Sequence, residues 1–129
     1  ILVTRAVTVS MAPEEFLTAC DYVWLVSGNE VPDKVARAGF HTVRSAFVNA
    51  PLIEELPMTL ECEFVSYDRE SNHLVGRIVN VSADESVLAG GGWLAPARLK
   101  PVTYDPIHLR YLPLGEAVGK AFAEGKKLR

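Results

Sequence analysis

The residues best suited to chemistry in this chain are few and widely spaced. His41, His73 and His108 are its three histidines, and histidine is the side chain that most readily transfers protons near neutral pH. They form no HExxH motif and no cluster with cysteine, so their spacing does not predict a metal site. Ser27 lies in a Val-Ser-Gly-Asn segment, which lacks the GxSxG frame that presents a nucleophilic serine. These patterns alone predict no reaction.

The cysteines and tryptophans are interpreted as structural residues. Cys20 and Cys62 stand in apolar surroundings without CxxC spacing, which favours buried thiols in a reducing compartment over a disulfide or a reactive thiol. We therefore expect the protein to be cytoplasmic. Trp24 and Trp93 are predicted to be core or interface aromatics. The three glycines at 90–92 lack the GxGxxG spacing of a phosphate cradle and are predicted to form a surface loop.

The composition is that of an ordinary globular domain. The chain has 129 residues, of which 49% are hydrophobic and 22% charged, and its formal net charge is −3. Without a basic stripe, neither nucleic acid nor an anionic membrane is an expected partner. No apolar run approaches the roughly 20 residues that cross a bilayer. We expect one domain over residues 1–129.

The first third of the chain predicts one strand and two short helices. Residues 2–10 alternate and are rich in β-branched side chains, which predicts a strand. A helix is predicted to begin at 12–15, where proline and two acids suit a first turn, and to stop at 27–29. There Gly28 is expected to adopt the left-handed conformation of a C-cap. A second short helix is expected over 34–38, ending at Gly39.

The centre of the chain predicts a β-hairpin. Over 58–68, Met, Leu, Cys and Phe at 58, 60, 62 and 64 alternate with Thr59, Glu61 and Glu63. The polar segment 68–72 is typical of a turn, and residues 73–82 return as a second strand. Gly76, inside that strand, indicates a bulge or a close backbone approach.

The C-terminal part predicts a further hairpin and a helix. Segments 101–105 and 108–112 flank a turn at Asp105-Pro106, a helix is expected over about 115–123, and a basic tail follows. A brief strand is also expected near 42–44. Short strands joined by polar turns favour a mainly β fold with short helices (α+β), and a small barrel rather than a parallel sheet.

Five segments resemble, in order, motifs of the flavin reductase-like and flavoredoxin family. The segment 72–81, NHLVGRIVNV, is similar to the family's HHLFIGEIVNV strand. The ending LGEAVGKAFAEGKKL is similar to the family's LGEKVGKAF-x-x-GKKL. The other similar segments are 19–28 with 33–34, 50–62 and 99–106.

The resemblance implies an FMN-binding split β-barrel that works as a homodimer, with the flavin at the subunit boundary. Members of the family reduce flavin with NADH or NADPH, or pass electrons through bound FMN. The sequence does not choose between the two nicotinamides, nor does it name the final electron acceptor. The family's N-terminal strands, which carry further flavin contacts, have no counterpart in this chain, which therefore resembles the C-terminal two thirds of the domain.

The resemblance also implies site residues. Lys34 matches a lysine that meets the flavin phosphate or ring, and Ser27, Gly28 and Asn29 form the preceding loop, whose backbone donors line the same pocket. His73 matches a histidine near the flavin and the nicotinamide, where an imidazole donates a hydrogen bond or shuttles a proton as a catalytic group. Ile107 stands where relatives often carry an aromatic and implies an apolar contact.

Interpretations without a binding role stay open for these residues. Without the resemblance, Lys34 is an exposed helix lysine and His73 faces solvent at a hairpin edge. Val23-Trp24 replaces the family's Cys-Gly. These departures leave two alternatives to a flavin reductase: a flavin-carrying electron-transfer or storage protein without nicotinamide turnover, and a flavin-free dimerisation domain.

Overall fold

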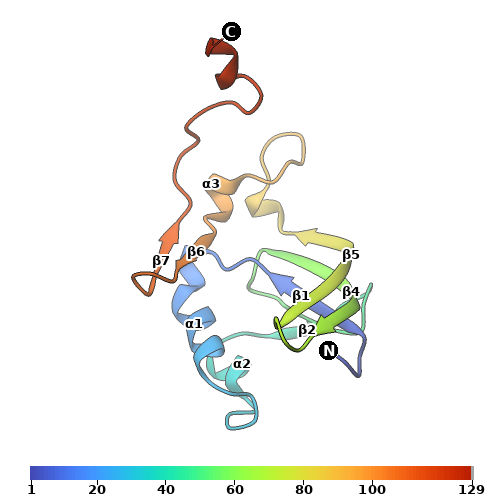
Figure 1. Cartoon of the computed structure of the whole chain (residues 1–129). Coiled ribbons are helices and arrows are strands. Elements are labelled where there is room, and N and C mark those ends of the chain that lie inside the picture. The colour runs from blue at the N-terminus through green and yellow to red at the C-terminus, as the bar shows by residue number, and fades with distance from the viewer. Residues whose placement is uncertain (129) are drawn as a thin grey trace.

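The computed structural model, which describes residues 1–128, consists of strands and short helices (Figure 1). No helix in that part of the chain is long and apolar enough to span a bilayer. In chain order the elements are β1 (Ala6–Ser10), η1 (Glu14–Phe16), α1 (Leu17–Leu25), α2 (Lys34–Arg37), β2 (Thr42–Arg44), β3 (Pro51–Ile53), β4 (Met58–Asp68), β5 (His73–Ala83), η2 (Glu85–Val87), α3 (Pro96–Leu99), β6 (Val102–Asp105), β7 (Arg110–Pro113) and η3 (Glu124–Leu128).

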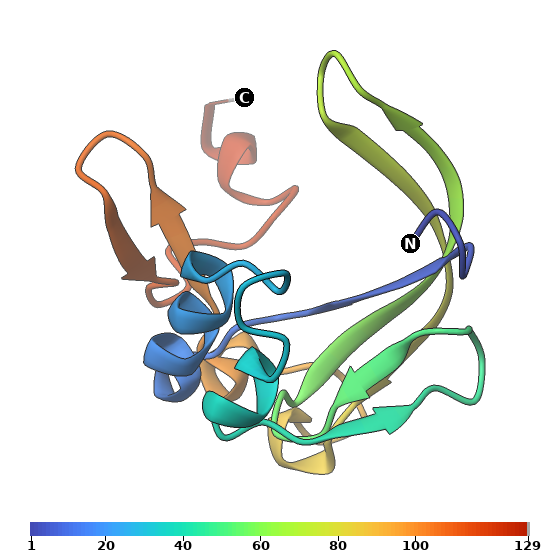
Figure 2. The ribbon, with the colours of Figure 1, turned by 90° about the horizontal axis from the view of Figure 1, so that it is seen from below.

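The largest sheet has three antiparallel strands in the order β1-β4-β5. Two further antiparallel pairs, β2–β3 and β6–β7, complete the described strands. In Figure 2 the β2–β3 pair lies beside the long β4–β5 hairpin, and the β6–β7 hairpin lies on the other side of the molecule next to α1. The mainly β prediction with short helices is confirmed.

The predicted central hairpin is confirmed, together with the special role of Gly76. The pairing of β4 with β5 shifts register between Glu61 and Cys62 and again between Phe64 and Ser66. A Cβ added to Gly76 would lie 3.1 Å from the Cβ of Cys62, closer than two such carbons normally approach. The strands therefore come close at a bulge, and a side chain at this position would require Cys62 to shift by a few tenths of an ångström.

The two faces of the β1-β4-β5 sheet differ in polarity. Directly paired residues share a face, and the registers define a polar face and an apolar face. The polar face carries Thr8, Ser10, Thr59, Glu61, Asn80 and Ser82, and the apolar face carries Val7, Val9, Leu60, Cys62, Ile78 and Val81. The polar face is the covered one: Thr59 and Glu61 are buried, and the Thr8 hydroxyl donates to the Pro51 carbonyl of β3 at 2.6 Å. On the apolar face Val9, Ile78 and Val81 are exposed.

The first predicted strand is shorter than expected. The prediction of a strand over 2–10 is wrong for residues 2–5, which form a turn in which the Arg5 N–H donates to the Ile1 carbonyl at 2.8 Å. Arg5 has a φ of 55°, which is incompatible with an extended strand. Its guanidinium lies 4.2 Å from the centre of the Phe64 ring, so a cation–π contact accompanies the turn.

The expected glycine cap of α1 is also wrong. Gly28 does not have a positive φ, whereas Gly39, which follows the Ala38 C-cap of α2, has a φ of 81°. Instead, α1 ends where the backbone of Val26 becomes extended. The Lys34 ammonium donates hydrogen bonds to the Val23 and Val26 carbonyls at this end of the helix. A cation at the negative end of the helix dipole replaces the cap.

The predicted C-terminal helix over 115–123 does not form. Residues 114–118 are irregular, and the regular structure that follows is η3, at 124–128. Val118 and Phe122 are fully exposed, so this segment has no packed apolar face to stabilise a helix of that length. Arg129, the end of the predicted basic tail, lies outside the described residues.

The two tryptophans are not core residues. Trp24 is 77% exposed and Trp93 is 78% exposed, which leaves the interface alternative as the prediction. Cys62 is buried and Cys20 is half-buried, and both are free thiols. The predicted strand at 42–44 and the hairpin formed by β6 and β7 are both confirmed.

Candidate functional site

The loop between α1 and α2, together with the first residue of α2, holds four of the predicted site residues. The Ser27 carbonyl accepts the N–H groups of Glu30 and Val31 at 3.2 and 2.9 Å, which closes a turn. The Ser27 hydroxyl accepts the Asn29 N–H at 3.2 Å. The N–H of Gly28 makes no hydrogen bond within residues 1–128 and belongs to an exposed residue, so it can donate to a ligand.

Lys34 ties this loop to the end of α1. Its ammonium donates to the carbonyls of Val23 and Val26, both at 2.7 Å. An ammonium has three N–H donors, so one is left for a ligand. A Cβ added to Gly28 would lie 3.8 Å from the Cε of Lys34, which places the two residues side by side. An ammonium donor and a free backbone N–H next to it suit an anionic oxygen such as that of a phosphate.

His73 lies elsewhere in the fold. It is the first residue of β5, pairs with Asp68 across the hairpin, and is exposed. The turn before it is ordered by the Tyr67 hydroxyl, which donates to the Asn72 side chain at 2.8 Å. Figure 2 shows the β4–β5 turn far from α2 within one chain.

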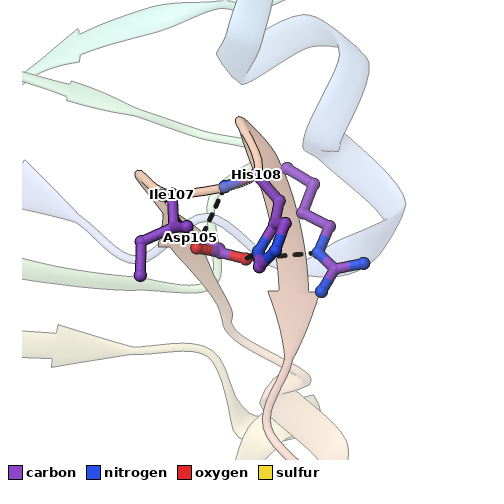
Figure 3. A network of polar contacts seen from close by, with 4 residues as sticks. Asp105, Ile107 and His108 are labelled. Carbon is purple, nitrogen blue, oxygen red and sulfur yellow. Dashed lines mark hydrogen bonds and ion pairs between the residues drawn. The ribbon is translucent and has the colours of Figure 1, made fainter.

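Ile107 occupies the turn between β6 and β7, which is held by the carboxylate of Asp105 (Figure 3). One carboxylate oxygen accepts the N–H groups of Ile107 and His108 at 3.0 and 3.4 Å. The other carboxylate oxygen accepts hydrogen bonds from Nδ1 of His108 at 2.8 Å and from Nε of Arg110 at 3.2 Å. The hydrogen bond from His108 is the main reason that the pKa of Asp105 lies below its usual range. The turn thus presents Ile107, which is 82% exposed, on a fixed support.

The structure therefore brings together Ser27, Gly28, Asn29 and Lys34, and it places His73 and Ile107 on two separate hairpin turns. In Figure 2 these two hairpins stand on opposite sides of the chain. A single pocket that contains all six residues is not formed within residues 1–128.

A buried carboxylate is the largest feature that the sequence interpretation missed. Glu61 is fully buried on the polar face of the sheet. One of its oxygens accepts the Asn80 amide at 2.7 Å and the Ser82 hydroxyl at 2.5 Å, and the other accepts the Ser45 hydroxyl. Burial acts to raise the pKa of Glu61, but the three hydrogen bonds outweigh it, and the pKa is lowered.

This network fixes the loop that covers the sheet. The Ser45 hydroxyl also accepts the N–H groups of Phe47 and Val48 at 2.9 and 3.0 Å, so it joins the 45–50 segment to β4. The sequence signal that could have revealed the network is the set of small polar residues, Asn80 and Ser82, on the strand that pairs with Glu61. Within residues 1–128 the side-chain hydrogen bonds of Glu61 all come from neutral groups, and they hold the sheet and the loop together.

Comparison with solved structures identifies the type of fold. The chain is similar to the flavoredoxin of Desulfovibrio vulgaris (Miyazaki F), with 31% identity and a TM-score of 0.89 over 97% of this chain and 67% of that chain. It is also similar to a flavoredoxin from Methanosarcina acetivorans, with 24% identity and a TM-score of 0.88 over 100% of this chain and 68% of that one.

A more distant structure has the same fold. The FMN-binding domain of a flavin reductases-like enzyme from Shewanella baltica OS155 matches with 16% identity and a TM-score of 0.76, over 91% of this chain and 64% of that chain. No family model matches the sequence, and a comparison with curated proteins gave no match. The fold is thus that of the FMN-binding split barrels.

With this identity and coverage, the chain belongs to the flavoredoxin and flavin reductase-like family. It spans about two thirds of the length of the two flavoredoxin chains.

Proposed function

We propose that this chain binds FMN through the α1–α2 loop and acts as an oxidoreductase of the flavin reductase type. Two observations support the proposal: the 31% identity to a flavoredoxin over 97% of the chain, and the free donors of Gly28 and Lys34 in one loop. The geometry of the loop carries it, because two adjacent donors, one of them charged, suit the phosphate of FMN.

Each site residue has a distinct part in this proposal. Lys34 and the backbone N–H groups of 27–29 bind the phosphate or the ring of the flavin. His73 donates a hydrogen bond or holds a proton beside the flavin, and Ile107 supplies an apolar contact. Bound FMN supplies the hydride and electron chemistry, while the protein binds and orients it.

The proposed active form is a homodimer. His73 and Ile107 lie on separate turns within one chain, and a second copy could place one of these turns against the α1–α2 loop of its partner. The exposed side chains Val9, Ile78 and Val81 of the apolar face support this, because such a face is expected to be covered by another surface. Analytical ultracentrifugation tests the assembly, and a purely monomeric protein at micromolar concentration would contradict it.

As an enzyme, the protein would use NADH or NADPH to reduce the bound flavin. The alternative is a flavin-binding electron-transfer or storage protein without nicotinamide turnover, and a flavin-free dimerisation domain is the third possibility. Stopped-flow mixing with NADH and then NADPH separates them: fast loss of the oxidised flavin absorbance is expected for the reductase. Slow loss identifies the carrier, and absence of flavin binding identifies the flavin-free domain.

A charge-neutral variant of Lys34 tests the binding site directly. Lys34→Gln keeps an amide donor for the α1 carbonyls and removes the positive charge. We expect the dissociation constant for FMN, measured by quenching of flavin fluorescence, to rise about tenfold or more, as loss of a charged hydrogen bond predicts. Lys126→Gln, which removes the same charge from the exposed η3, is the control and should bind like the wild type. Equal dissociation constants for the two variants would remove Lys34 from the site.

The cytoplasm is the proposed location. Both Cys20 and Cys62 are free thiols, which suits a reducing compartment. Localisation of a tagged copy in cells tests this.

A further inference from the structure

A cavity of about 310 Å³ lies between α1 and the β6–β7 hairpin. The two elements are side by side in both Figure 1 and Figure 2. Leu17, Cys20, Asp21 and Trp24 of α1 line one side, and Tyr104 and Tyr111 line the other. The volume falls at the lower end of the range of small-molecule sites, roughly 300–1,000 Å³.

Aromatic rings form much of the wall. Tyr104 and Tyr111 face each other across the β6–β7 pair, with ring centres 5.7 Å apart and an angle of 51° between the rings. Trp24 stands at the rim and is largely exposed in spite of its size. Aromatic side chains bind flat apolar ligands by edge-to-face or offset contacts.

One polar pair stands in this otherwise apolar wall. The Tyr111 hydroxyl donates to Oδ1 of Asp21 at 2.5 Å, a bond that joins residues 90 positions apart. Within residues 1–128, Oδ2 of Asp21 accepts no hydrogen bond, so this oxygen can accept one from a ligand. The bond to Asp21 raises the pKa of Tyr111, and burial raises the pKa of the Cys20 thiol, so both groups stay neutral near pH 7.

We propose that this cavity binds a small planar aromatic molecule that carries an N–H or O–H donor. The ring packs against Trp24 and the two tyrosines, and the donor bonds to Oδ2 of Asp21. The aromatic wall favours a ligand with a flat apolar ring. The Asp21 oxygen without a hydrogen-bond partner favours a ligand that carries a donor rather than an acceptor. None of Ser27, Gly28, Asn29, Lys34, His73 or Ile107 lines the cavity, so it shares no lining residue with the proposed flavin site.

The probe is 5-fluoroindole, followed by fluorine NMR during titration of the flavin-free 129-residue protein. We expect saturable binding, and binding of 5-fluoro-1-methylindole, which lacks the N–H donor, should be at least fivefold weaker. Absence of saturable binding up to the solubility limit overturns the proposal, and so does equal binding of the two probes.

A pair of tryptophan variants locates the site. Trp24→Ala and Trp93→Ala remove the same side chain at nearly the same exposure, but only Trp24 lines the cavity. We expect Trp24→Ala to weaken binding of 5-fluoroindole about tenfold, and Trp93→Ala to leave it unchanged. Because Trp24 is so exposed, its loss should leave the fold intact, which the far-ultraviolet circular dichroism spectrum checks. Equal effects of the two variants overturn the proposal.

Two further measurements decide the role of Asp21 and the independence of the site. In Asp21→Ala the two probes should bind alike, and a preserved preference for the N–H probe contradicts the assigned contact. Saturating FMN should leave binding of 5-fluoroindole unchanged, whether or not FMN itself binds. Displacement by FMN would make the cavity part of the flavin site. If the probe fails to bind while Trp24→Ala weakens self-association, a second copy occupies the cavity.

Discussion

The polar face of the β1-β4-β5 sheet is covered, while Val9, Ile78 and Val81 on its apolar face are exposed. The polar face, with Thr59 and Glu61, is buried under the β2–β3 pair. On the buried face, cohesion comes from hydrogen bonds that converge on one carboxylate. On the apolar face Cys62 is buried, but Val9, Ile78 and Val81 have no comparable cover within residues 1–128.

The difference shows that side-chain polarity does not by itself decide which face of a sheet is covered. A buried carboxylate is tolerated here because Ser45, Asn80 and Ser82 satisfy its oxygens. The exposed apolar face is consistent with a protein that works as an assembly. One face therefore maintains the fold of the chain, and the other is available for association.

The largest expected effect comes from removing the buried carboxylate. Glu61→Leu leaves the three donors without a partner, and we expect the free energy of unfolding to fall by about 3 kcal/mol or more. Glu63→Leu is the matched control, since Glu63 lies on the same strand and makes an exposed ion pair with Arg77. Its effect should stay within about 1 kcal/mol. Urea denaturation measures both, and a similar loss in the two variants would show that the Glu61 network adds nothing.

A charge on the apolar face should affect association rather than folding. Ile78→Lys is expected to raise the dissociation constant of the proposed homodimer at least tenfold, about 1.4 kcal/mol, because it places an ammonium in the contact. The stability of the monomer should change by no more than about 0.5 kcal/mol, as for other exposed positions.

Val118→Lys adds the same charge at a fully exposed residue away from the sheet and serves as its control. Sedimentation equilibrium measures the association of both variants. An unchanged dissociation constant for Ile78→Lys would separate the apolar face from the dimer interface.

The smallest expected effect is on how the stability of the protein depends on pH. The folded-state pKa of Glu61 is lowered from 4.5, so its contribution to stability is present above that pH and is lost as the pH falls through the folded pKa. Glu61→Gln does not titrate, so its stability should fall less than that of the wild type between pH 6 and pH 3. Urea midpoints at several pH values measure this difference. Parallel curves would mean that the pKa of Glu61 is the same in the folded and unfolded states.

The alternation of apolar and polar residues and the turn residues predicted those elements whose strands are neighbours in the sequence. The β4–β5 hairpin follows from alternation and turn residues, and the bulge with its close backbone approach follows from Gly76 within the second strand. The resemblance placed Ser27, Gly28 and Asn29 in the loop before Lys34, and in the structure Gly28 lies beside the Lys34 side chain. Whether these residues bind flavin is the proposal tested above.

What was missed depended on contacts between distant segments. Alternation assigns Glu61 and Leu60 to opposite faces, but it cannot say that the 45–50 segment will cover the polar one. The predicted helix over 115–123 failed for the same reason, because helical spacing stabilises a helix only where a partner packs against it. The Asp21–Tyr111 bond joins residues 90 positions apart and has no local signature.

The strand order β1-β4-β5 has a consequence for the route of folding. The two longest strands are joined by a short turn, so their hairpin can form in roughly 1–10 μs. β1 must pair with β4 across a separation of 49 residues, as the contact between Ser10 and Thr59 shows, and closure of such a long loop is slow. Docking of β1 onto a preformed hairpin is therefore expected to limit the folding rate, and substitutions in β1 should slow folding more than those in the β4–β5 turn.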